Sequence, residues 1–290
     1  MQPERVADTK CALGEGPLWH ADEQRLYWAD ITGGALWRWD ARTGQHERCY
    51  SGPQVGGFTF QEDGSLLLFR EKGSIVRWWD GSVVETLYED IPEERQTRFN
   101  DVSADPAGRV FCGTMATKER RGTLYRLDTD GSLHVAIESV GISNGIGFTP
   151  DRRGMYYTDT ADNAIYLFDY DAATGAISNR RVFASVPREE GEGFPDGMTV
   201  DAEGYVWSAR WDGSCAVRYA PDGTIVERVA FPAKKVSSAA FGGPEWKDLY
   251  FTTAGGDKRE TEGDGAGAIF RIRPQVGGSP EFRSRVSVKR

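Results

Sequence analysis

Short runs of apolar residues recur along the whole chain, and turns rich in Gly, Asp, Asn and Pro separate them. Examples are residues 26–28, 66–69 and 249–251, each of which follows a turn and precedes a second apolar run. Runs of this length between turns indicate β-strands. No segment has the apolar period of about 3.6 residues that marks a long helix. The pattern therefore predicts an all-β protein.

The strands are grouped in six repeats, each opened by a polar or small residue. The equivalent openings are Glu15, Gly57, Asn100, Asn144, Asp196 and Ser238, at steps of 42, 43, 44, 52 and 42 residues. Two further landmarks recur at similar offsets in every repeat: the turn that precedes the second strand, and the third strand itself. A period of about 40–50 residues with several strands per repeat is typical of a β-propeller. We predict one six-bladed β-propeller over residues 1–290, with blades opening near residues 15, 57, 100, 144, 196 and 238.

The two ends of the chain have different expected roles. Residues 5–8 precede the first repeat and have the pattern of a strand. We expect this strand to complete the last blade, whose other strands come from about 237–275, because such closure removes an exposed sheet edge. The tail from Ser279 is polar and basic, and we expect it to fray.

Charge and composition exclude several classes of partner. The chain has 35 Lys and Arg against 44 Asp and Glu, a net charge of −9, and no basic stripe, so nucleic-acid binding is not expected. It has no apolar segment of about 18 residues and no secretory signal at its start, so we expect no membrane span and a cytoplasmic location. Cys11, Cys49, Cys112 and Cys215 are widely spaced, which favours free thiols. We expect a monomer or weak oligomer.

The repeat openings carry the candidate chemistry. The innermost strand of each blade runs beside the central axis, so its first residues converge at one mouth of the channel. Four of the six openings carry oxygen ligands: Glu15, Asn100, Asn144 and Asp196. Two carboxylates and two amides facing a channel are costly unless paired, and they suit a divalent cation. Asp and Asn at strand starts can instead simply cap turns.

The loops on the same face form a second group of candidates. Asp30 and Asp159 end second strands, where we expect them to cap turns or support the site. Two loops are longer than the others, at 115–121 and 254–267. Long loops at such a mouth set ligand specificity or act as lids, although a solvated loop without a role is an equal alternative for residues 256–265.

Several of these segments resemble the gluconolactonase/regucalcin/luciferin-regenerating-enzyme family over about residues 11–275. The similar segments are Leu-Gly-Glu-Gly-Pro-Leu-Trp at 13–19, Arg-Phe-Asn-Asp at 98–101, Cys-Gly-Thr-Met at 112–115, Ser-Asn-Gly at 143–145 and Phe-Pro-Asp-Gly-Met at 194–198, with 241–244 and 249–253. The resemblance implies a six-bladed propeller with one divalent ion on its axis, which could be Ca²⁺, Zn²⁺, Mg²⁺, Mn²⁺ or Fe²⁺. It implies that Glu15, Asn144 and Asp196 bind this metal.

The resemblance also implies the substrate contacts, which map onto Arg98 and Asn100. In regucalcin-like members a Glu follows the Gly-Thr-Met segment and touches the sugar. Here Thr117-Lys118 stands nearby, so Lys118 becomes the candidate contact.

These residues together predict metal-dependent hydrolysis of a sugar (aldono)lactone to its aldonic acid in carbohydrate catabolism. A metal ion would polarise the lactone carbonyl, and Arg98 would supply fork-shaped donors. Asp196 is the candidate general base, and hydroxide on the ion is the alternative nucleophile. Two other functions compete: hydrolysis of a phosphotriester or aryl lactone on the same scaffold, and metal or ligand binding without catalysis.

Overall fold

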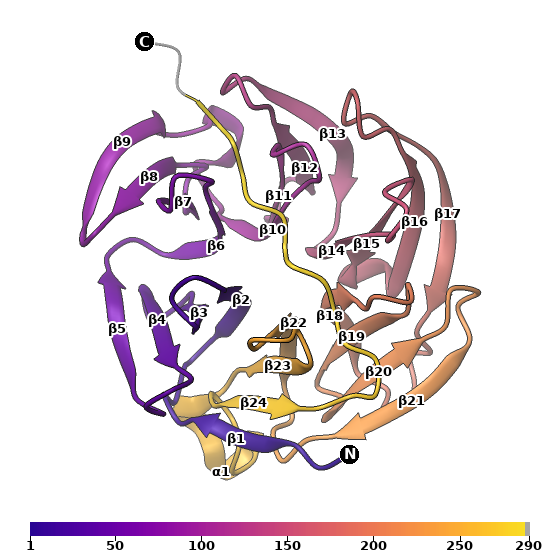
Figure 1. Ribbon diagram of the computed structural model, residues 1–290. Helices are drawn as coiled ribbons and strands as arrows, with labels where there is room; N and C mark the ends of the chain where they lie inside the picture. Colours follow the sequence, from indigo (N-terminus) through magenta and orange to yellow (C-terminus); the bar gives the residue numbers. More distant parts are fainter. Residues whose placement is uncertain (288–290) are drawn as a thin grey trace.

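The computed structural model describes residues 1–287 and shows six four-stranded antiparallel sheets arranged in a ring (Figure 1). Each sheet is one blade of a β-propeller. The predicted all-β, six-bladed propeller is therefore confirmed. No helix among residues 1–287 is long and apolar enough to span a membrane. Cys11, Cys49, Cys112 and Cys215 are all free thiols, as predicted.

The first three blades follow one another directly in the sequence. Blade 1 consists of β2 (Gly14–His20), β3 (Arg25–Asp30), β4 (Ala35–Asp40) and β5 (His46–Ser51). Blade 2 consists of β6 (Val55–Phe60), β7 (Leu66–Arg70), β8 (Ile75–Trp79) and β9 (Ser82–Tyr88). Blade 3 consists of β10 (Phe99–Ala104), β11 (Val110–Thr114), β12 (Gly122–Leu127) and β13 (Leu133–Val140).

The last three blades complete the ring. Blade 4 consists of β14 (Ser143–Phe148), β15 (Gly154–Asp159), β16 (Ala164–Tyr170) and β17 (Ile177–Ser185). Blade 5 consists of β18 (Phe194–Val200), β19 (Val206–Trp211), β20 (Cys215–Tyr219) and β21 (Ile225–Ala230). Blade 6 consists of β22 (Val236–Gly242), β23 (Asp248–Thr253), β24 (Ile269–Ile272) and β1 (Glu4–Ala7). Three 3₁₀ turns, Pro92–Glu94, Thr160–Asp162 and Gly256–Lys258, and the one-turn helix α1 (Arg259–Glu262) lie in loops.

The N-terminal strand closes blade 6, as the sequence predicted. Strand β1 pairs antiparallel with β24, with Glu4 opposite Arg271, and the two side chains form an ion pair at 2.6 Å. Because the first and last segments of the chain share one sheet, the ring is held shut by backbone hydrogen bonds.

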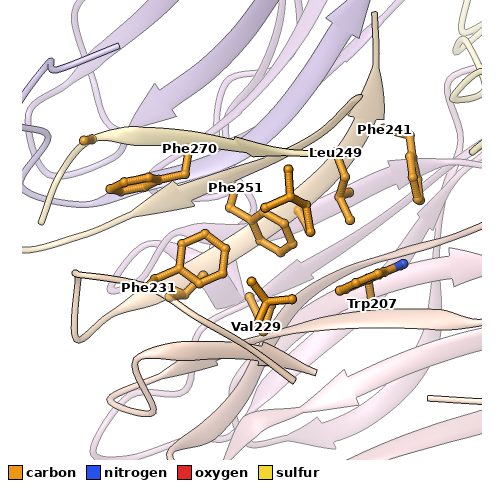
Figure 2. Close-up of a cluster of buried hydrophobic side chains, with 13 residues drawn as sticks. Trp207, Val229, Phe231, Phe241, Leu249, Phe251 and Phe270 are labelled. Carbon is orange, nitrogen blue, oxygen red and sulfur yellow. The ribbon is translucent and has the colours of Figure 1, made fainter. Parts of the chain in front are cut away.

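The core lies in the interfaces between neighbouring blades. The largest cluster joins blades 5 and 6, where Phe251 packs against Phe231 with ring centroids 4.9 Å apart and against Trp207 at 6.4 Å (Figure 2). Burial of each large apolar side chain contributes about 1.5–3 kcal/mol. Six such clusters make the ring rigid and thereby fix the spacing of the innermost strands.

The six innermost strands, β2, β6, β10, β14, β18 and β22, pack against one another around the axis. Each has a register irregularity near its start, between Glu15 and Leu18 in β2 and between Phe99 and Val102 in β10, for example. A bulge re-aims side chains and is common beside active sites. All six innermost strands therefore have such an irregularity at the same mouth of the channel.

The C-terminal strap, residues 277–287, crosses the opposite mouth of the channel (Figure 1). Backbone hydrogen bonds tie it to four blades: Ala202 N to Gly277 O, Gly278 N to Trp246 O, Ser284 N to Phe60 O and Arg285 N to Gly108 O. Arg283 pairs with Asp22 of blade 1 at 2.6 Å, and the ring of Phe282 lies 6.0 Å from that of Phe148 in blade 4. The expectation that the tail frays from Ser279 is therefore wrong as far as residue 287, because the strap contacts every blade.

Candidate active site

Four polar residues of the innermost strands are buried at the mouth opposite the strap. Glu15, Asn100, Asn144 and Asp196 expose 3–5 % of their surface. Gly57 occupies the equivalent position in blade 2, where a Cβ atom would lie 2.8 Å from Val102 Cγ2. The polar residues that open the repeats therefore lie together at one mouth of the channel. Val102 of the neighbouring blade occupies the space beside Gly57.

A continuous chain of hydrogen bonds runs through three blades at this mouth. Arg98 Nη1 donates to Asn100 Oδ1 at 2.6 Å, and Asn100 Nδ2 donates to Asn144 Oδ1 at 2.6 Å. Asn144 Nδ2 donates to Thr160 Oγ1 at 2.7 Å, and that hydroxyl donates to Pro195 O at 2.6 Å. The chain ends one residue before Asp196, so every amide at the site has a fixed orientation.

Three carboxylates, those of Glu15, Asp101 and Asp196, influence one another at this mouth. Burial raises the pKa of Glu15 well above its usual value, and the charges of Asp196 and Asp101 raise it further. Burial and Asp101 likewise raise the pKa of Asp196. Burial raises the pKa of Asp101 to about 7, although Arg98 opposes the shift. Burial also lowers the pKa of the Arg98 guanidinium, against the pull of the three acids.

One guanidinium cannot neutralise three neighbouring carboxylates, so the ionised cluster needs further positive charge. Oxygen Oε2 of Glu15 is buried and has no hydrogen-bond partner among residues 1–287. Asn144 Oδ1 accepts one hydrogen bond and keeps a second lone pair. An all-oxygen set of Glu15, Asn144 and Asp196 therefore fits a hard divalent cation. Within residues 1–287 no group of three His, Cys, Asp or Glu side chains could hold a metal by itself.

The sequence-predicted residues are not all brought together. Glu15, Arg98, Asn100, Asn144 and Asp196 are linked by hydrogen bonds or by their mutual effects on pKa. Lys118 is exposed in the loop that follows β11, and no hydrogen bond or ion pair within residues 1–287 joins it to the others.

Asp30 and Asp159 cap turns, which is one of the two roles expected from the sequence. Asp30 accepts hydrogen bonds from the backbone of Leu13 at 3.0 Å and of Gly33 at 3.3 Å. Asp159 accepts from Gly141 at 2.8 Å and from Ala161 at 3.1 Å. Both therefore hold the loops that carry the site.

Two charged residues of α1 anchor the long loop between β23 and β24. Glu262 of α1 pairs with Lys235, and Arg259 Nη1 donates to Asp8 at 3.1 Å. The segment thus has a defined conformation above blade 6.

Sequence reasoning missed two residues of the site. Asp101 follows Asn100 directly, and a regular strand would point it away from the channel. The bulge in β10 brings it beside Glu15 and Asp196. Thr160 lies in the 3₁₀ turn after β15 and orients Asn144, a role that no local pattern signals.

Comparison with known proteins assigns the chain to a family. The family model described as SMP-30/Gluconolactonase/LRE-like region matches residues 13–255. The chain belongs to this family. The SMP-30/gluconolactonase family assignment agrees with the resemblance noted in the sequence, and the matched residues include every predicted site residue.

Individual relatives match over nearly the whole chain. Pentonolactonase XacC of Haloferax volcanii is 50 % identical, over 99 % of each chain. Regucalcin of Gallus gallus is 34 % identical, over 93 % of each chain. The solved structure of regucalcin from Agrobacterium tumefaciens, described as a calcium-binding protein, has a TM-score of 0.89 at 26 % identity and covers 97 % of each chain. These relatives of the SMP-30/gluconolactonase family share the propeller as a whole.

Proposed function

We propose that this chain is a lactonase that hydrolyses a sugar lactone to its aldonic acid and uses one divalent metal ion. The observation that carries the proposal is the Arg98 guanidinium held against Asn100 beside three carboxylates at one mouth of the channel. The 50 % identity to a pentonolactonase supports the reaction, and the calcium-binding relative supports the metal.

The metal would be held by Glu15, Asn144 and Asp196. When bound, it would act as a Lewis acid that polarises the lactone carbonyl and neutralises the acid cluster. Asn100 and Thr160 hold the Asn144 amide with its oxygen fixed for this task.

The chain's own residues then provide positioning and proton transfer. Arg98 uses Nη1 for Phe99 O and Asn100 Oδ1, which leaves Nε and Nη2 to bind substrate oxygens. The Asp196 carboxylate accepts a proton as water attacks the carbonyl carbon. The ring carbon–oxygen bond then breaks, the same proton passes to the departing ring oxygen, and the new carboxylic acid loses its proton to solvent. Donors at Arg98 stabilise the resulting carboxylate.

A pH-stat screen tests the proposal, because lactone opening releases acid. Aldonolactones, aryl esters and phosphotriesters are compared, each with added divalent ions and with chelator. We expect turnover of aldonolactones that chelator abolishes and metal restores. Preferential turnover of phosphotriesters or aryl lactones would favour the alternative hydrolase, and metal binding without any turnover would favour a binding protein.

A further inference from the structure

Arg98 also lines a second feature, an open depression of about 410 Å³ between blades 2 and 3. Its other walls include Gln54, Glu71, Lys72, Thr97 and Met115. Ligand pockets have volumes of about 300–1,000 Å³, so a sugar-sized molecule can enter. Because Arg98 also donates to Asn100, the depression adjoins the candidate active site.

The walls of the depression are rigid, since backbone bonds join the two blades beneath it. Glu71 and Arg98 form an antiparallel bridge. Lys72 N donates to Thr97 O at 2.8 Å, and Met115 N donates to Arg98 O at 3.1 Å. Lys72 itself has a φ of 63°, a left-handed conformation that costs a residue with a side chain about 1 kcal/mol or more. The site is therefore preorganised.

Several polar side chains in this depression have no partner. Those of Gln54, Glu71 and Lys72 make no hydrogen bond or ion pair among residues 1–287. Arg95 on the same wall differs, because it is paired with Asp90 at 2.7 Å. The residues that carry an acid, an amide and an ammonium group without such bonds thus line the depression together with Arg98.

This set of groups matches a polyol better than an anion. Each hydroxyl is both a donor and an acceptor, so it can satisfy Lys72 and Glu71 alike. A carboxylate only accepts hydrogen bonds, and it repels phosphate, sulfonate and carboxylate groups. Glu71 therefore provides selection against anionic substituents, whereas Lys72 and Arg98 alone would attract them.

We propose that this depression binds the hydroxylated part of the lactone and that Glu71 determines specificity for neutral polyhydroxylated lactones. The inference rests on the proposed lactonase function and adds its substrate class. The lactone carbonyl lies toward Asp196, and the hydroxyls farther along the carbon chain lie over blades 2 and 3, where Glu71 accepts their hydrogen bonds.

The test pairs a substrate change with a protein change. The wild type, Glu71→Gln and Glu71→Ala are assayed on an aldonolactone, on the lactone of the same ring size without hydroxyls, and on a phosphorylated aldonolactone. We expect Glu71→Ala to lower kcat/KM roughly 10- to 100-fold on the aldonolactone, mainly through KM, the scale of one hydrogen bond to a charged group. The unsubstituted lactone should be unaffected. Glu71→Gln keeps one acceptor and should lose less, while improving the phosphorylated substrate relative to the neutral one.

Glu89→Ala is the matched control, since Glu89 is an exposed acid on the same blade without a partner among residues 1–287. It should match the wild type on all substrates, and melting temperatures confirm that each variant is folded. Equal losses on hydroxylated and unsubstituted lactones would overturn the specificity role, as would no loss on either. A wild type that prefers the phosphorylated lactone would also overturn it. A wild type that opens no lactone would instead refute the proposed function itself.

Discussion

Asn100 donates a hydrogen bond from Nδ2 to Oδ1 of Asn144 at 2.6 Å and so joins blade 3 to blade 4 at the mouth of the channel. The two residues lie 44 positions apart in the sequence. Because Asn144 Nδ2 is also committed, to Thr160, the amide cannot turn over. Asn100 therefore orients the oxygen proposed to bind metal, in addition to its predicted contact with substrate.

Asn100→Ala should accordingly weaken metal binding. Loss of a residue that orients a ligand costs about 10- to 100-fold in metal affinity, and Asn144→Ala should cost more. Calorimetric titration with Ca²⁺ or Mn²⁺ measures both variants. Asn179→Ala, on the outer strand of blade 4, is the control. Unchanged metal affinity with a raised KM would limit Asn100 to substrate binding.

The wild-type protein should bind one divalent ion per chain. Binding to the folded state alone raises the free energy of unfolding by about 2.7 kcal/mol at 100 times the Kd, so the melting temperature should rise with metal concentration. Glu15→Gln removes one charge and should abolish most of this shift. Calorimetry that finds several equal sites, or none, would contradict a single axial ion.

Arg98→Ala should separate substrate binding from metal binding. The variant leaves the carboxylates of Glu15, Asp101 and Asp196 without their guanidinium, so its metal affinity should equal or exceed that of the wild type. Its kcat/KM should fall about 100-fold, the usual effect of losing a donor to a developing charge. Arg98→Lys keeps the charge but not the fork, and should recover only part of the activity. Loss of metal in Arg98→Ala would reverse the assigned roles.

Asp196→Asn tests whether this residue moves a proton or only binds metal. The amide keeps one coordinating oxygen and removes the proton acceptor. We expect kcat to fall at least about 100-fold, the scale of a general base, and saturating metal should not restore it. The measurement is kcat across a metal titration. Recovery to near the wild-type rate would show that Asp196 acts as a ligand alone.

Glu281 of the C-terminal strap should make stability depend on pH. It lines a small cavity of about 50 Å³ in the channel together with Asp101, and burial raises its pKa above the ordinary 4.5. The folded protein then binds this proton more tightly than the unfolded chain, so the contribution of Glu281 to stability is fully present below pH 4.5 and is lost as pH rises through the folded pKa. Glu281→Gln removes this penalty and keeps an acceptor for Thr199.

The variant should therefore melt at a higher temperature than the wild type near pH 8 and lose that advantage near pH 4. Glu89→Gln, at an exposed residue without a partner among residues 1–287, serves as the control. If the melting temperatures of variant and wild type differed by the same amount at every pH, the ionisation of Glu281 would not be coupled to stability.

The sequence by itself determined the propeller and most of the candidate site. Strand patterns are local, so six repeats of the same apolar and polar order define six blades. Glu15, Asn100, Asn144 and Asp196 follow from their equivalent positions, whereas the choice of metal ligands among them followed from the family resemblance. The closing strand was also predictable, because residues 5–8 have no repeat of their own to join.

Tertiary structure decided what depends on contacts between distant residues. The bulge in β10 turns Asp101 toward the channel, although strict alternation places it on the other side. The strap follows from bonds such as Gln61 Nε2 to Val286 O, between residues 225 positions apart. Glu71 meets Arg98 only because blades 2 and 3 adjoin. Local patterning fixes which residues form each blade, whereas packing between blades fixes which side chains face one another, and the candidate chemistry depends on the second.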